Sequence, residues 1–224
     1  MGYYIDLEKI TLDEYKAKLE VGYLPPSRMI LKENLNERFD ILKQRGVNNL
    51  KDLQQILKQK NNLTEFSKIE YFSEEYLSIL LREINSMHPK PNKIKDFIGI
   101  SNQTINKLEK IGIKDTVKLF DRVKNSQKRH ELANYLDIPE DEILILTKLI
   151  DLSRIKWVGA TFARMLLEVG CDSVQKAANS NPEDLYKKIN QINKEKNFFK
   201  GGIGLNDMRI FVFAAKEVPI EIEY

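Results

Sequence analysis

One phrase occurs three times in this chain and limits what it can fold into. Each copy has a glycine that ends an apolar helical stripe, then an apolar residue, then a polar residue: Gly46-Val47-Asn48-Asn49, Gly112-Ile113-Lys114-Asp115 and Gly170-Cys171-Asp172-Ser173. Glycine readily adopts the left-handed backbone that closes a helix, and the polar residue is a typical N-cap of the next helix. The glycines lie 66 and 58 residues apart. The spacing therefore indicates short helices built by internal repetition.

Apolar residues recur at helical spacing through most of the chain, which predicts an all-α fold. Pro89 and Pro91 mark a boundary because proline ends any helix before it. We expect a helical unit over residues 1–88, a second domain over 93–219 and a terminal strand over 220–224. Residues 3–7 and 218–223 have β-type patterns, and we expect them to pair as antiparallel strands, within one chain or between two.

A tight-turn pattern precedes three of the expected helices. An apolar residue stands between two small or turn-forming residues in Gly99-Ile100-Ser101, Trp157-Val158-Gly159 and Gly202-Ile203-Gly204. This pattern resembles the helix-hairpin-helix motif, whose hairpin reads glycine, apolar residue, glycine. We expect the apolar residue to fill the small core between two helices. We also expect Gly159 to hold a backbone conformation that a β-branched residue cannot adopt.

Residues 93–219 resemble the family named domain of unknown function 4332. The resemblance lies in three stretches: Glu131-Leu132-Ala133 with Leu136-Asp137-Ile138; Asp151-Leu152-Ser153-Arg154-Ile155; and Asn181-Pro182-Glu183-Asp184-Leu185-Tyr186 followed by Asn193-Lys194-Glu195-Lys196. It implies paired helix-hairpin-helix units and no established activity. We interpret residues 1–88 as a divergent unit of the same kind, in which Glu33-Asn34-Leu35 holds the aligned positions without a glycine.

A hairpin helix can bind phosphate through the unpaired backbone N–H groups at its N-terminus. The net charge of the chain is only +3, but residues 93–129 hold ten basic and four acidic residues. The leading hypothesis is therefore sequence-independent binding of duplex nucleic acid through hairpin backbone amides. The candidate contact residues are Gly99, Ile100, Ser101, Lys107, Lys110, Lys114, Val158, Gly159, Lys200, Gly202, Ile203 and Gly204.

The alternative is a protein-interaction scaffold in which the hairpins only pack. Trp157 replaces the first hairpin glycine and Ser101 a second one, and the positions just after the turns are neutral. Charged residues in a mixed pattern are also typical of a solvated face. Basic residues that share a face with the hairpins would favour nucleic-acid binding, whereas scattered ones would favour the scaffold.

No phosphate-binding loop, nucleotide fingerprint or nucleophile elbow is present. His88 and His130 have no cysteine or carboxylate at metal-ligand spacing, and the one cysteine, Cys171, follows a helix-ending glycine where a core residue is expected. We therefore expect a non-catalytic protein without metal or cofactor. The absence of a long apolar run or a secretory signal predicts a soluble, cytoplasmic protein, whose partner is duplex DNA or another protein and not a membrane.

Overall fold

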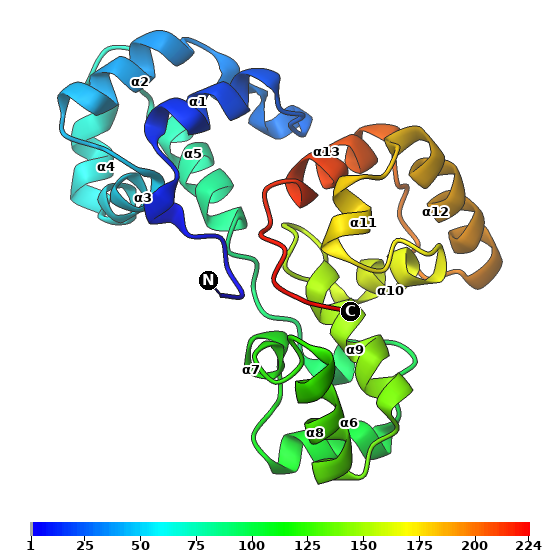
Figure 1. Ribbon diagram of the computed structural model, residues 1–224. Helices are drawn as coiled ribbons and strands as arrows, with labels where there is room; N and C mark the ends of the chain where they lie inside the picture. Colours follow the sequence, from blue (N-terminus) through cyan, green and yellow to red (C-terminus); the bar gives the residue numbers. More distant parts are fainter. Residues whose placement is uncertain (1) are drawn as a thin grey trace. The chain divides into compact units, whose positions relative to one another are not determined.

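The computed structural model describes residues 2–224 (Figure 1). It divides into a smaller unit, residues 5–88, and a larger unit, residues 2–4 and 89–224. Every regular element in the described residues is a helix, so the all-α prediction is confirmed. None of these helices is long and apolar enough to cross a membrane.

The smaller unit holds five α-helices and two short 3-10 helices. In chain order they are η1 (Leu7–Lys9), α1 (Leu12–Val21), η2 (Pro26–Lys32), α2 (Leu35–Gln44), α3 (Leu50–Lys58), α4 (Lys60–Ser67) and α5 (Glu74–Ser86). Its core contains buried Phe39, Leu53 and Tyr76, and the guanidinium of buried Arg38 lies 3.8 Å from the centre of the Tyr76 ring. Asn34 has a left-handed backbone, φ +47°, directly at the N-cap of α2.

The larger unit is organised around one buried helix, α9. Its elements are η3 (Ile94–Asp96), α6 (Asn102–Lys110), α7 (Thr116–Phe120), α8 (Ser126–Leu136), α9 (Glu140–Leu152), α10 (Ala160–Glu168), α11 (Val174–Ala178), α12 (Pro182–Lys196) and α13 (Leu205–Ala215). Helix α9 packs against α7 and α8, which precede it in the chain, and against α10 and α11, which follow it (Figure 1). Five of its apolar residues are fully buried: Ile143, Leu146, Leu149, Ile150 and Leu152.

The three predicted helix-ending glycines have the expected left-handed backbone. The φ angles of Gly46, Gly112 and Gly170 are +81°, +82° and +80°. At Gly112, the glycine N–H donates to the Glu109 carbonyl and the next N–H, of Ile113, donates to the Leu108 carbonyl, both at 3.0 Å. The same pair of bonds recurs at the other two glycines. This is the Schellman closure of a helix C-terminus, and the prediction is confirmed.

The polar residues that follow are N-caps, as predicted. The side chains of Asn49, Asp115 and Ser173 each accept a hydrogen bond from the backbone N–H three residues further on. With a constant offset of 58 positions, residues 93–120 and 151–178 therefore share helix, glycine, cap and helix in one order. We call them the first and second repeat.

The predicted terminal strands do not form. The described residues contain two isolated β-bridges, Thr11 with Asn49 and Lys93 with Asp115, and neither involves residues 3–7 or 218–224. The chain ends are instead held by side chains: Arg154 donates to the carbonyls of Tyr3 and Pro219. These charged donors satisfy backbone carbonyls that a strand partner would have bound. The predictions of a strand pair within one chain and of a strand over 220–224 are therefore wrong, whereas pairing between two chains stays a prediction.

Candidate nucleic-acid interface

The first hairpin requires glycine at its first position. Gly99 has φ +82°, and a Cβ atom there would lie 2.9 Å from Nη1 of Arg164 on α10. Ile100 is buried as the predicted plug, and Ser101 is the N-cap of α6, where its Oγ accepts from the Thr104 N–H at 3.1 Å. The left-handed backbone therefore favours glycine at position 99, and a side chain there would also displace the end of the Arg164 side chain.

The second hairpin reaches the same shape with different residues. Trp157 has φ +66° at the position of the first glycine, and Val158 is buried as the plug. Gly159 has φ −86° and ψ 172°, extended backbone that any residue adopts, and nothing lies within 4 Å of a Cβ built there. The prediction that Gly159 holds a conformation closed to β-branched residues is wrong, because the left-handed residue of this turn is Trp157.

The third hairpin matches the consensus in sequence but not in backbone. Gly202 does not have a positive φ, and the left-handed residue in this region is Asn197, φ +50°, which ends α12. Gly204 is the N-cap of α13, and its N–H donates to Asp207 Oδ2 at 2.8 Å. Ile203 is partly buried and its carbonyl accepts from Asn190 at 3.4 Å. The consensus letters alone therefore do not determine this turn.

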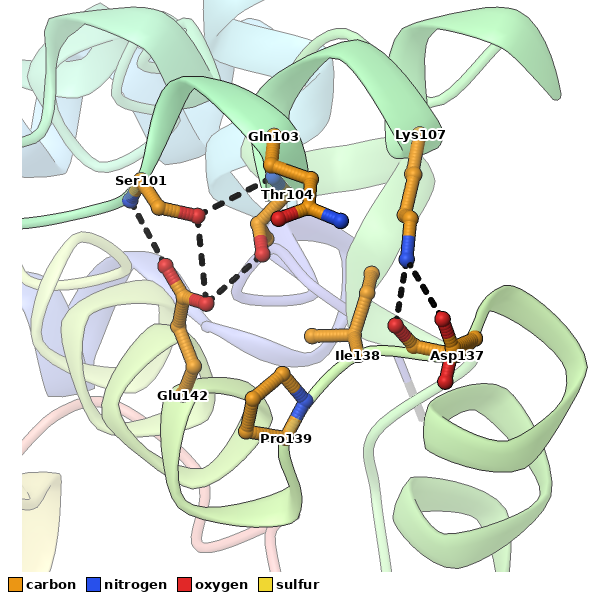
Figure 2. A pocket seen from close by; sticks show the side chains of 8 residues that line it. All are labelled: Ser101, Gln103, Thr104, Lys107, Asp137, Ile138, Pro139 and Glu142. Carbon is orange, nitrogen blue, oxygen red and sulfur yellow. Dashed lines mark hydrogen bonds and ion pairs between the residues drawn. The ribbon is translucent and has the colours of Figure 1, made fainter.

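An internal carboxylate occupies the N-terminus of α6 (Figure 2). Glu142, from α9, accepts hydrogen bonds from the Ser101 N–H at 2.6 Å, from the Thr104 hydroxyl at 2.7 Å and from the Ser101 hydroxyl at 3.3 Å. Burial by itself would raise the pKa of Glu142, but these three hydrogen bonds outweigh it and lower the pKa. Glu142 is therefore ionised at neutral pH and holds the place at the helix N-terminus that a phosphate would take.

The predicted basic residues do not gather around the hairpins. Lys107 donates to the backbone carbonyl of Asp137 and forms an ion pair with its Oδ2 at 3.2 Å (Figure 2). Lys110 and Lys114 are exposed; Lys110 is the last residue of α6, and Lys114 lies between α6 and α7. The nine residues of α6, about 14 Å at a rise of 1.5 Å each, separate Lys110 from the first hairpin. Lys200 is exposed near the third hairpin.

The profile of the family described as domain of unknown function (DUF4332) matches residues 98–218, more than half of the chain. The chain belongs to the DUF4332 family. Searches of curated proteins and of solved structures found no significant match. The family match spans both repeats and the third hairpin, and the helix-hairpin-helix identity of the units remains our interpretation of the repeated turns.

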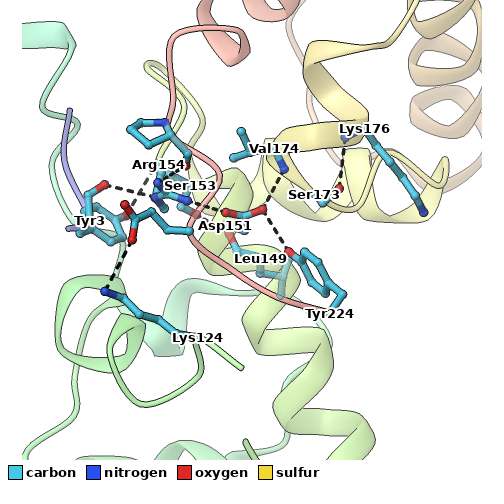
Figure 3. A network of polar contacts seen from close by, with 12 residues as sticks. Tyr3, Lys124, Leu149, Asp151, Ser153, Arg154, Ser173, Val174, Lys176 and Tyr224 are labelled. Carbon is cyan, nitrogen blue, oxygen red and sulfur yellow. Dashed lines mark hydrogen bonds and ion pairs between the residues drawn. The ribbon is translucent and has the colours of Figure 1, made fainter. Parts of the chain in front are cut away.

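A buried polar network joins the two repeats of the DUF4332 domain (Figure 3). Arg154, 2% exposed, forms an ion pair with Asp151 Oδ1 at 2.7 Å, and its guanidinium lies 4.9 Å from the centre of the Phe120 ring in the first repeat. Asp151 Oδ2 accepts from the Val174 N–H at 2.8 Å and from the Tyr224 hydroxyl at 3.0 Å. Because the three guanidinium nitrogens of Arg154 and both carboxylate oxygens of Asp151 have partners within the chain, we assign these two residues to structure and not to ligand binding.

Other reactive side chains are placed away from any common site. Cys171 is buried, as predicted, and burial raises the pKa of its thiol to about 11, so it is protonated at neutral pH. Within residues 2–224, no three histidine, cysteine or acidic side chains lie close enough to hold a metal ion.

Glu142 is the residue that sequence reasoning missed. Its sequence position, in the first turn of α9 after Pro139, suggests only a favourable interaction with the dipole of its own helix. Its partners lie 41 and 38 positions earlier in the chain, so no local pattern could have identified them.

Proposed function

We propose that the DUF4332 domain is a non-catalytic protein-interaction module in which the hairpin turns pack and do not contact nucleic acid. The observation that carries this proposal is the hydrogen bond from the Ser101 N–H to Glu142. A phosphate at the same helix terminus would have to displace a carboxylate that accepts three hydrogen bonds. It would also leave two negative groups at one helix terminus, which is unfavourable.

The third hairpin supports the same conclusion. The N–H of Gly204 already donates to the carboxylate of Asp207, which belongs to the same helix. Among the three helices that follow the hairpins, α10 alone has an N-cap whose backbone N–H has no carboxylate partner in the described residues. Two of the three proposed phosphate sites are therefore satisfied internally, and backbone gripping by paired hairpins loses its geometric basis.

Duplex nucleic-acid binding is the second candidate, and one observation favours it. Lys110, Lys114, Lys118 and Arg122 are exposed, and their side chains form no ion pair in the described part of the chain. Such residues could neutralise phosphates without help from the hairpins. Each neutralised phosphate adds about 0.9 to the slope of log affinity against log salt, so three or four contacts give a slope near −3.

Two measurements on the full chain separate the candidates. Fluorescence anisotropy with a labelled duplex of about 30 base pairs is titrated at several salt concentrations, where non-specific binders have Kd values of roughly 10⁻⁴ to 10⁻⁶ M. In the second measurement, the full chain is immobilised and used to select binders from a random-peptide display library. We expect enriched peptides and no duplex binding at low salt. Duplex binding with a slope near −3, lost in Lys110→Glu/Lys114→Glu, or a selection that enriches no peptide, would overturn the protein-interaction proposal.

A further inference from the structure

The two repeats differ in charge at equivalent surface positions. The first repeat has Lys110, Lys114, Lys118 and Arg122, and an offset of 58 aligns these with Glu168, Asp172, Lys176 and Ser180. The backbone at these positions follows the same course in both repeats, from the end of one helix through a left-handed glycine into a short helix. The difference therefore lies in the side chains alone.

The second repeat neutralises its own charges. Asp172 pairs with Lys176 at 2.7 Å and with Lys148 of α9 at 2.8 Å. Glu168 pairs with Arg164 and with Lys196 of α12. In this repeat, carboxylates of the chain itself therefore supply the partners of Lys176 and Arg164.

In the first repeat, the exposed cations are not paired with carboxylates in the described part of the chain. Lys118 and Arg122 line a groove of about 290 Å³ together with Ile111, Ile113 and Tyr135. Tyr135 is 70% exposed and Ile111 37% exposed, although both are large apolar or aromatic residues. The side chains of Lys118 and Arg122 make no ion pair or hydrogen bond in the described residues. The groove thus combines exposed apolar surface with two uncompensated positive charges.

We propose that this groove docks an acidic segment of a partner protein that carries one aliphatic side chain. The aliphatic side chain packs between Tyr135 and Ile111, and flanking carboxylates pair with Lys118 and Arg122, the latter able to bind a carboxylate with two parallel N–H donors. The inference rests on the proposed function and gives it a place and a ligand chemistry. The carboxylate is the group that the second repeat supplies at Asp172 for its own Lys176.

The lining of the groove favours a peptide over nucleic acid. Two isoleucines and a tyrosine form three of its five lining residues. Nucleic-acid interfaces are more polar and much more positively charged than this, whereas peptide sites pair apolar anchors with a charged rim. The volume is at the lower limit of small-molecule pockets and suits a single anchoring side chain.

The experiment measures anisotropy of short labelled peptides with the full chain. The probe has a central leucine flanked by glutamates; matched probes replace the leucine by serine or the glutamates by glutamines, and a labelled oligothymidylate and a duplex serve as nucleic-acid probes. We expect binding of the first peptide only. Tyr135→Ser and the double variant Lys118→Glu/Arg122→Glu should each weaken it about tenfold or more, as loss of an interface anchor or a charge pair does.

Two variants outside the groove control for folding and for the reversal of a surface charge. Lys194 on α12 is exposed and forms no ion pair in the described residues, and Ile220 is 66% exposed. Lys194→Glu and Ile220→Ser should change the peptide Kd less than about twofold, as residues outside an interface do. Absence of peptide binding, or equal effects of groove and control variants, overturns the groove. The proposed function then still stands if display-selected peptides bind elsewhere. Oligothymidylate or duplex binding that is lost in Lys118→Glu/Arg122→Glu overturns both.

Discussion

The first and second repeats of the DUF4332 domain share a backbone but use it differently. Both close a helix with a left-handed glycine, Gly112 and Gly170, and both start the next helix with a side-chain cap. The first repeat leaves Lys110, Lys114 and Lys118 without an ion pair in the described residues and receives Glu142 at its hairpin. In the second repeat, Glu168 and Asp172 form ion pairs with lysines and an arginine of the same domain. The glycines and N-caps of the turns therefore determine the backbone of a repeat. The other side chains determine whether its surface charges are paired within the chain or remain available.

The largest difference in burial and charge between the two repeats lies at the aligned positions 154 and 96. Position 154 holds a buried arginine, and the equivalent position 96 in the first repeat holds an exposed aspartate. Arg154 binds both chain ends and Asp151, whereas Asp96 has no ion pair in the described residues. The second repeat is thus the anchor of the larger unit.

Arg154→Met tests this asymmetry with the largest expected effect. Removing the guanidinium leaves Asp151 as a buried charge without its ion-pair partner, which costs about 3–5 kcal/mol of unfolding free energy. The matched change Asp96→Asn, at an exposed position, should cost less than about 0.5 kcal/mol. Urea unfolding followed by circular dichroism measures both. Equal effects at the two positions would show that the repeats carry the fold equally.

Glu142→Gln tests the internal anion of the first repeat. We expect a loss of about 1–2 kcal/mol, because a charge-assisted set of hydrogen bonds becomes neutral. Since the pKa of Glu142 is lowered in the folded protein, its contribution is fully present above the ordinary glutamate pKa of 4.5 and is lost as pH falls through the folded-state pKa. The stability gap between parent and variant should therefore narrow in acid. A gap that stays constant from neutral pH to pH ~3 would contradict an ionised cap.

The helical fold could be predicted because its signals are local. Each helix-ending glycine and each N-cap acts within a few residues, so the sequence pattern is sufficient to identify them. The terminal segments show the opposite case: residues 218–223 alternate like a strand, but Arg154 and Arg129 bind their carbonyls. Both arginines are far away in the chain, and a local pattern cannot reveal them.

The candidate site was less predictable for the same reason. The hairpin positions Gly99 and Val158 were found from sequence, and the structure places them as turn and plug. Whether the amide at Ser101 is available depends on Glu142, 41 positions away. Similarly, the charge of residues 93–129 suggested a basic face, but Lys107 turns to Asp137. Contacts between helices decide which donors and charges remain available.

An effect of similar size is expected at the helix-ending glycines, and it should be equal in the two repeats. Gly112→Ala and Gly170→Ala each force a side chain into the left-handed region and should cost about 1–2 kcal/mol. Since nothing lies within 4 Å of a Cβ at either position, the cost is conformational and not steric. Thermal or urea unfolding should give similar values for the two repeats. A cost confined to Gly170 would place the stability of the unit in the second repeat alone.

The smallest expected effect is that of Gly159→Ser, a substitution that makes the second hairpin resemble the first. Gly159→Ser installs the residue that stands at position 101, and the backbone of Gly159 already suits any residue. The hydroxyl can accept the N–H of Phe162, as Ser101 accepts that of Thr104. Together with the lower entropy of the unfolded chain, we expect a gain of about 0.5–1 kcal/mol. Gly159→Ala keeps the entropy change without the hydroxyl, so it should fall between parent and serine variant. A serine variant less stable than the alanine variant would mean that the open N-terminus of α10 does not accept a cap, and that the two hairpins differ in more than their side chains.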